Sequence, residues 1–315
     1  MWPFRRAKAP TLTVDPHAGD QTARAINTAL AAHDWAEAGT LLRNVTDGDD
    51  RAYYLRLTSD IPDLRDPLGE WVAAEPGDGL PLAVRGAYSI SWAWRARGTQ
   101  RAQNTSQDQF REFFRRLRLA EDDLDDAIAA DPDDVAARSM LVVSARGRQI
   151  EPPEARARFD AVVERHPGHL YAHQARLQYL CAKWYGSHEE MFAFARDSFA
   201  KEPDGSQLGG LIPEAHVERW EGSADYFADP AVRAELREAA ERSIFHPSYV
   251  ARPGWVGVHN HFAFALSFAG EHAAAARAFA PLGDLVSEYP WAYLGQPGKA
   301  FTERRATTTA AVAGK

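Results

Sequence analysis

Residues 187–203 read SHEEMFAFARDSFAKEP, an amphipathic segment that ends at a proline. Two earlier segments of the same kind also end at a proline, so that Pro132, Pro167 and Pro203 follow one another at intervals of 35 and 36 residues. Proline cannot continue a helix, and a period of this size is typical of stacked helical hairpins. The recurrence therefore predicts that the middle of the chain repeats one helical unit.

The residues upstream of each proline share a pattern. The positions twelve, eight and five residues before the three prolines hold Ala120, Ala155 and Met191, then Leu124, Phe159 and Ala195, then Ala127, Val162 and Ser198. These offsets fall at i, i+4 and i+7 of a helix, where they form one continuous stripe. We expect this stripe to pack against the preceding helix and the next hairpin.

The frame is similar to the second helix of a tetratricopeptide repeat followed by the first helix of the next repeat. Four further segments carry a narrower resemblance: WAWRARG (92–98), KWYGSHEEMFAFAR (183–196), GWVGVHNHFAFALSFAGEHAAAA (254–276) and YPWAYLG (289–295). They resemble a group of actinobacterial tetratricopeptide-like helical-repeat proteins of unknown function. The resemblance covers most of the chain and implies an all-α fold, a tetratricopeptide-like α-solenoid of antiparallel helical hairpins. Ala195 departs from the repeat consensus, which usually has an aromatic residue there.

The chain is expected to fall into four parts. They are a basic flexible tail at 1–18, N-terminal helical hairpins at 19–100, the tetratricopeptide-like region at 101–300 and a disordered tail at 301–315. Ser106 and Gln109 form the pattern of a capping box, which predicts a long helix from there to Ala130. No segment alternates apolar and polar residues over the length of a strand, so we expect no sheet.

Composition limits the classes of function. The net charge of −8 argues against general nucleic-acid binding, which needs a basic face to neutralise phosphates. The one cysteine, Cys181, cannot form an internal disulfide, which suits the cytoplasm. No apolar run is long enough to span a bilayer, so we expect no membrane span.

The acidic run of 121–134 offers one alternative site. Asp122, Asp123 and Asp126 satisfy the aspartate-rich pattern by which isoprenoid enzymes hold magnesium and a diphosphate, because carboxylates one turn apart can share a hard cation. The simpler interpretation is a solvated helix face, since short acidic patterns recur in acidic helices. The main prediction is therefore no metal and no cofactor, with the metal-dependent enzyme kept as the alternative.

Aromatic, arginine and histidine residues near helix ends are the preferred candidates for a binding site. The candidates are Trp92, Trp94, Arg95, Arg97, Trp184, Tyr185, His188, Trp255, His259 and His261. Tryptophan and arginine dominate binding hot spots, because one buries a large area and the other donates to carboxylates or stacks on rings. The structural alternative is that each tryptophan packs between helices. No histidine arrangement matches a zinc motif, and no catalytic set is recognisable.

The sequence thus favours a protein-interaction scaffold or adaptor that binds a partner protein segment in the concave face of a helical-repeat solenoid. A small-molecule binder or enzyme would use the same concavity as an enclosed pocket. A homo-oligomeric structural element would instead show a self-complementary apolar face.

Overall fold

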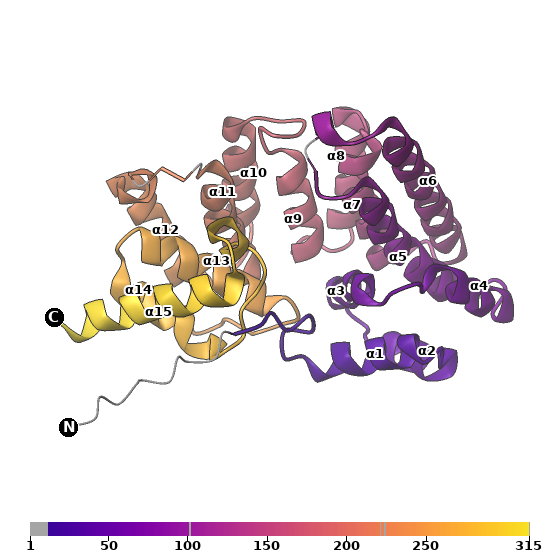
Figure 1. Ribbon diagram of the computed structural model, residues 1–315, viewed down its shortest axis with the longest axis horizontal. Helices are drawn as coiled ribbons and strands as arrows, with labels where there is room; N and C mark the ends of the chain where they lie inside the picture. The colour runs from indigo at the N-terminus through magenta and orange to yellow at the C-terminus, as the bar shows by residue number, and fades with distance from the viewer. Residues whose placement is uncertain (1–11, 101, 221, 224, 315) are drawn as a thin grey trace, which may run out of the picture. The chain divides into compact units, whose positions relative to one another are not determined.

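The computed structural model describes residues 12–100, 102–220, 222–223 and 225–314 and is all-α (Figure 1). No strand occurs among these residues, as the sequence predicts. The chain divides into two compact units, Asp20–Pro203 (the N-terminal unit) and, as far as it is described, 12–19 with 204–314 (the C-terminal unit). We expected a boundary at 100/101. The helices on either side of it, α5 (Gly79–Arg97) and α6 (Gln107–Ala130), pack closely together and belong to the same unit.

The N-terminal unit holds the first ten helices. They are α1 (Gln21–Ala31), α2 (Trp35–Arg43), α3 (Gly48–Leu57), α4 (Arg65–Ala74), α5 (Gly79–Arg97), α6 (Gln107–Ala130), α7 (Val135–Arg148), α8 (Pro152–Val163), α9 (Leu170–Tyr179) and α10 (His188–Ala200). From α6 to α10 each helix packs against the next one along the chain. The three repeated prolines follow the ends of α6, α8 and α10, so the predicted helix ends are confirmed.

The predicted apolar stripe is the buried face of α6, α8 and α10. Eight of its nine residues are buried, and Ser198 is half-buried. The predicted capping box also forms at the start of α6, where the Gln109 N–H donates to Ser106 Oγ at 3.2 Å and the Ser106 N–H donates to Gln109 Oε1 at 3.0 Å. Capping satisfies N–H groups that have no partner within the helix. Periodicity and capping therefore fix α6 from local sequence alone.

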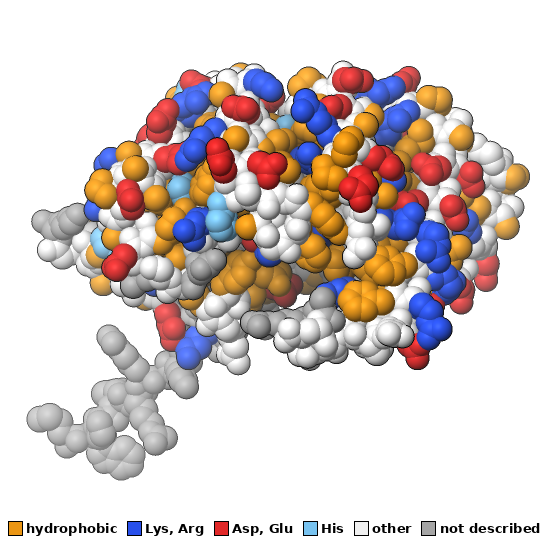
Figure 2. Space-filling model, turned by 90° about the horizontal axis from the view of Figure 1, so that it is seen from above, with side chains coloured by type: hydrophobic (Ala, Val, Ile, Leu, Met, Phe, Trp, Pro, Cys, Tyr) orange, Lys and Arg blue, Asp and Glu red, His pale blue; other side chains and the backbone are white. Residues whose placement is uncertain are grey.

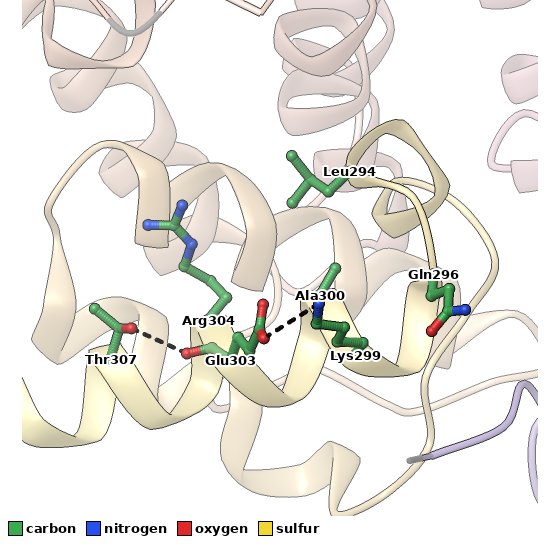
Figure 3. Close-up of a pocket in the computed structure, with 7 residues that line it drawn as sticks. All are labelled: Leu294, Gln296, Lys299, Ala300, Glu303, Arg304 and Thr307. Carbon is green, nitrogen blue, oxygen red and sulfur yellow. Dashed lines mark hydrogen bonds and ion pairs between the residues drawn. The ribbon is translucent and has the colours of Figure 1, made fainter.

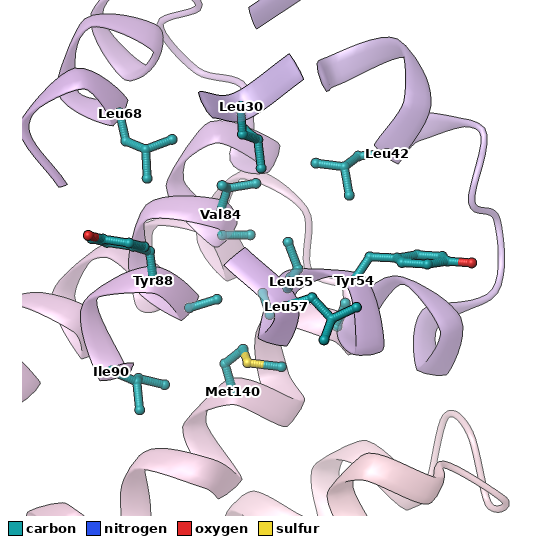
Figure 4. Close-up of a cluster of buried hydrophobic side chains, with 14 of the residues drawn as sticks. Leu30, Leu42, Tyr54, Leu55, Leu57, Leu68, Val84, Tyr88, Ile90 and Met140 are labelled. Atoms are coloured by element: carbon teal, nitrogen blue, oxygen red, sulfur yellow. The ribbon is translucent and has the colours of Figure 1, made fainter. Parts of the chain in front are cut away.

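A large apolar core joins the first five helices of the N-terminal unit to α6 and α7. Leu30, Leu55, Val84, Tyr88 and Met140 come from α1, α3, α5 and α7 and converge in one cluster (Figure 4). Helix α3 lies at its centre and packs against α1, α5, α7 and α9. The helices that precede α6 therefore share a core with α6 and α7.

Helix α3 also holds the start of α9. The backbone N–H groups of Leu170 and Tyr171 donate to the Asp49 carboxylate at 2.9 and 3.1 Å, and His169 Nδ1 lies 3.0 Å from the same carboxylate. Burial raises the pKa of Asp49, but the hydrogen bond from His169 and those from the two backbone N–H groups outweigh it, so the pKa lies below its ordinary value. A carboxylate at a helix N-terminus satisfies N–H groups that the helix itself cannot pair.

The carboxylate of Glu121, on α6, is buried against arginines of other helices. Glu121 accepts from Arg148 Nε at 2.8 Å, from Arg158 Nη1 at 2.7 Å and from Ser144 Oγ at 2.6 Å. Burial raises the pKa of Glu121, but these three donors outweigh it and the pKa lies below its ordinary value. The contacts tie α6 to α7 and α8.

The C-terminal unit is built around one apolar helix. Its helices are α11 (Leu211–Arg219), α12 (Pro230–Arg242), α13 (Trp255–Phe268), α14 (His272–Phe279) and α15 (Pro297–Ala313). The other four all pack against α13, which is buried on most of its surface. The amide of Asn260 on α13 is hydrogen-bonded, since its Nδ2 donates to the carbonyls of Val256 and Leu285 at 2.8 and 3.1 Å and its Oδ1 accepts from Trp291 Nε1 at 2.7 Å.

Short 3₁₀ helices complete the two units. They are η1 (Thr58–Asp60), η2 (Ala102–Asn104), η3 (Gln207–Gly210), η4 (Tyr226–Ala228), η5 (Ala280–Leu282) and η6 (Trp291–Leu294). Helix α14 ends at Phe279, and Pro281 and Gly283 follow, so the chain cannot continue the helix there.

The two ends of the chain differ from the sequence prediction in different ways. The predicted flexible tail lies outside the described residues up to residue 11, while the carbonyl of Leu12 packs against α15 where Gly298 has no side chain. The segment 301–315, expected to be disordered, is helical as far as Ala313. Its Phe301 and Thr308 are buried, which explains the order despite the weak apolar periodicity.

None of the helices in the described parts of the chain combines the length and the apolar character needed to cross a membrane.

Candidate protein-interaction surface

Four of the candidate residues meet in the N-terminal unit. Trp94 and Arg97 lie in the last turn of α5, and Trp184 and Tyr185 lie in the connection between α9 and α10. Trp94, Trp184 and Tyr185 contact Arg146, in the last turn of α7, and Arg97 lies against Trp94. All five side chains are half-buried. We call Trp94, Arg97, Arg146, Trp184 and Tyr185 the arginine–aromatic cluster.

Arg146 contacts both tryptophans. Its guanidinium carbon lies 5.3 Å from the ring centroid of Trp94 and 5.0 Å from that of Trp184. The two ring centroids are 6.2 Å apart, with planes at 79°. A guanidinium within about 6 Å of an aromatic ring is stabilised by roughly 0.5–2 kcal/mol, depending on exposure. The three side chains therefore hold one another in place.

Helix α6 packs against the cluster. The ring of Phe113 lies 4.8 Å from that of Trp94, and Gly147 of α7 faces both residues. A Cβ at Gly147 would lie 2.9 Å from Phe113 Cζ and 2.8 Å from Leu117 Cδ1, so the glycine permits the close approach of α7 to α6.

Arg97 extends the cluster toward solvent. Its guanidinium carbon lies 5.7 Å from the Trp94 ring and 5.8 Å from the Phe110 ring. Its Nη1 donates to the carbonyls of Gly98 and Gln100, each at 3.1 Å. Within the described residues, Arg97 pairs with no carboxylate. The guanidinium thus keeps donors that can bind a carboxylate from outside.

Tyr185 connects the cluster to α9. Its hydroxyl donates to the carbonyl of Arg146 at 3.3 Å, and its ring stacks on Tyr179 with centroids 4.7 Å apart. Burial raises the pKa of both tyrosines, so each stays a neutral hydroxyl at neutral pH.

Two other candidates on α5 point away from the cluster. Trp92 packs under Arg116, whose guanidinium carbon lies 3.8 Å from the ring and whose Nη1 donates to the Trp92 carbonyl at 3.0 Å. Arg95 lies over the ring of Tyr88 at 5.0 Å and donates to the carbonyl of Ser59 at 2.8 Å. Both residues fasten α5 to its neighbours.

The remaining candidates do not join the cluster. His188 is the half-buried first residue of α10, and the other three belong to α13 of the C-terminal unit. There the ring of His259 lies 5.4 Å from that of Trp255, and its Nδ1 is 3.2 Å from the carbonyl of Ala278. His261 Nδ1 lies 2.9 Å from the carbonyl of Gly257. Burial lowers the pKa of both His259 and His261, so both side chains stay neutral at neutral pH and serve as packing residues.

The aspartates of the alternative metal site diverge. Asp123 is buried and accepts from Arg85 Nε and Nη2 at 3.0 and 2.6 Å, with Arg65 at 3.3 Å. Asp122 and Asp126 are exposed on another side of α6. In the described parts of the chain, no group of three or more histidine, cysteine, aspartate or glutamate residues is arranged to hold a metal ion.

Sequence reasoning did not find Arg146, the residue at the centre of the cluster. Its only local signal is its place in the last turn of a helix, together with Arg148. Cations are common at helix C-termini because they interact with the helix dipole, so this position does not distinguish a binding residue.

Comparison of the sequence with protein-family models and with curated proteins gives no match.

Proposed function

We propose that this protein is an interaction module that binds a segment of a partner protein through the arginine–aromatic cluster. One observation carries the proposal. Arg146 lies between two half-buried indole rings, and Arg97, for which the described residues supply no carboxylate, lies against one of these rings. Tryptophan, tyrosine and arginine are the residues enriched in binding hot spots.

The chemistry of the cluster favours a partner segment that contains acidic residues. A guanidinium binds a carboxylate through two parallel hydrogen bonds, and the neighbouring indole rings offer apolar area to the stem of the partner's side chain. On the face shown in Figure 2, Lys and Arg side chains are interspersed with Asp and Glu side chains. A large basic field, which nucleic-acid binding requires, is not seen on that face.

We also propose that α6 to α10 are tetratricopeptide-like hairpins of an α-solenoid. The support is the buried stripe at the repeated positions and the packing of each helix on the next. Helical repeats of this kind bind segments of other proteins on surfaces that can change without disturbing the stack.

The test begins with selection of binding peptides from a displayed library on the full-length protein. The dissociation constant of a selected peptide is then measured for the wild type and for Arg97→Glu and Trp184→Ala. We expect each substitution to weaken binding by about 2 kcal/mol or more, roughly thirtyfold, as for hot-spot residues.

Arg156→Glu is the matched control. Arg156 has the same charge as Arg97 and is exposed on α8, where it pairs with Asp160 at 3.3 Å. We expect this variant to change the affinity by less than about 0.5 kcal/mol. Equal affinity in Arg97→Glu, Trp184→Ala and the wild type would overturn the proposal.

A further inference from the structure

A depression on the C-terminal unit lies away from the arginine–aromatic cluster in sequence. It has a volume of about 510 Å³ and is bordered by one face of α15 and by the segment that precedes it (Figure 3). Ligand sites typically have volumes of about 300–1,000 Å³. The depression is therefore large enough for a small organic molecule.

The charged side chains of the depression are not all paired. Lys299 Nζ lies 3.9 Å from Glu303 Oε1, one turn further along α15. Arg304 lies against Phe268 of α13, with its guanidinium carbon 3.7 Å from the ring centroid. No residue that the structure describes forms an ion pair or hydrogen bond with the guanidinium of Arg304.

The position of Arg304 makes it a natural anion-binding group. In Figure 3 its side chain extends from α15 beside the depression, and the stacking on Phe268 fixes the guanidinium plane. Burial lowers the pKa of Arg304, with no neighbouring carboxylate to oppose this effect. The group stays charged, because arginine is protonated at every physiological pH. A half-buried charge without a counter-charge gains from a ligand that supplies one.

We propose that this depression binds a small polar monocarboxylate, whose carboxylate group accepts two hydrogen bonds from the guanidinium of Arg304. Because Lys299 and Glu303 offset each other, Arg304 leaves one net positive charge, which matches a single carboxylate.

The other lining groups favour a ligand that carries hydroxyl or amide groups. Gln296 offers an amide, and Thr307 Oγ1, which donates to the carbonyl of Glu303 at 3.0 Å, can still accept a hydrogen bond. Leu294, on the segment that precedes α15, supplies an apolar contact. The lining is therefore suited to a polyhydroxylated acid more than to a fatty acid.

The test measures the binding of three probes to the full-length protein by saturation-transfer NMR of each probe. Gluconate carries a carboxylate and hydroxyl groups, sorbitol carries the hydroxyl groups without the carboxylate, and acetate carries the carboxylate alone. We expect gluconate to bind at millimolar concentration or below, sorbitol not to bind, and acetate to bind about tenfold more weakly than gluconate.

Two variants and one control locate the site. Arg304→Gln should weaken gluconate binding about tenfold or more, and Arg304→Lys should weaken it less, because it keeps the charge and loses the planar pair of donors. Arg305→Gln is the control, since Arg305 is the next residue of α15 but pairs with Asp284 at 3.1 Å. It should leave the affinity within about twofold of the wild type.

Absence of gluconate binding overturns the proposal, as do equal binding of gluconate and sorbitol and equal loss in Arg304→Gln and Arg305→Gln. Equal binding of acetate and gluconate would show an anion site without selection for the polar body and would overturn the ligand class. The comparison of gluconate with sorbitol uses the wild type alone, so it remains decisive if Arg304→Gln proves unstable.

Discussion

The two units stabilise their interiors with different chemistry. In the N-terminal unit, buried carboxylates such as Glu121 and Asp123 pair with arginines of neighbouring helices. In the C-terminal unit, the interior around α13 contains a cluster of aromatic rings, among them Phe264 and Trp291, and the neutral amide of Asn260 is hydrogen-bonded to Trp291. A buried ion pair favours packing between the helices that carry the opposite charges, whereas aromatic rings favour neighbours of complementary volume and shape. Different substitutions should therefore destabilise the two units.

The largest expected effect is in the aromatic interior. Trp291→Ala removes a fully buried indole and leaves Asn260 Oδ1 without its donor. Truncation of a buried tryptophan costs about 3–5 kcal/mol, and the lost hydrogen bond adds about 1–3 kcal/mol. We expect the free energy of unfolding, measured by urea denaturation, to fall by about 5 kcal/mol. Tyr293→Ala, in the same 3₁₀ helix but exposed, should cost much less, and equal losses would contradict the comparison.

The next effect is in the ion-paired interior. Glu121→Ala leaves the half-buried Arg148 and Arg158 without their shared carboxylate. Removal of one partner from a buried pair costs about 3–5 kcal/mol. Asp122→Ala, on the exposed side of the same helix, is expected to stay within about 0.5 kcal/mol of the wild type in the same urea titration. If Glu121→Ala were equally mild, the ion pairs would not select the packing of α6.

A smaller effect concerns pH. Burial lowers the pKa of His173, in α9, from 6.5 to about 4. The unfolded chain therefore takes up this proton at a higher pH than the folded chain, so the contribution to stability is complete above pH 6.5 and falls as the pH drops toward 4. We expect a loss of about 2 kcal/mol between pH 6.5 and about pH 5.

His173→Phe checks this origin of the pH dependence. The wild type also contains His259 and His261, whose pKa values burial lowers, so its slope reflects several protons. Urea titrations at several pH values should show a slope lower by about one proton, roughly 1.4 kcal/mol per pH unit, in the variant. An unchanged slope would mean that His173 is protonated equally in both states.

The smallest effects distinguish the packing of two glycines. A Cβ at Gly86 of α5 would lie 2.7 Å from Leu124 Cγ and 3.0 Å from the carbonyl of Ala120, whereas one at Gly257 of α13 would have no neighbour within 4 Å. Gly86→Ala should cost about 1 kcal/mol, because overpacking exceeds the gain in helix propensity. Gly257→Ala should stabilise by about 0.5–1 kcal/mol in thermal denaturation. Opposite signs are the expected result, and stabilisation by both would contradict the tight packing of α5 on α6.

Local sequence patterns predicted the helices better than their partners. The capping box at Ser106 and the prolines after α6, α8 and α10 act within one turn of the chain, so they are visible without a structure. The helix at the C-terminus was missed because Phe301 and Thr308 are buried by tertiary contacts rather than by a periodic pattern. Tertiary packing, not propensity, decides such a segment.

The candidate site shows the same division. Residue type alone singled out Trp94, Arg97, Trp184 and Tyr185, which the structure brings together. It could not separate them from Trp92, because residues two positions apart on α5 point to different sides and only the neighbours decide which side stays open. Arg146 needed the fold, since it reaches the tryptophans from another helix.

The carboxylate of Asp49 has a consequence for how the chain acquires its structure. It receives N–H groups of residues that follow it by 121 and 122 positions, and it belongs to a helix that also packs against α5 and α7. An ideal repeat array contacts only adjacent units, so that folding can nucleate anywhere and fragments survive. Here the hydrogen bonds at the start of α9 form only when Asp49 is brought to it, and closing the long loop between them is entropically costly. A fragment that begins at α6 would keep the repeat pattern and lose this anchor.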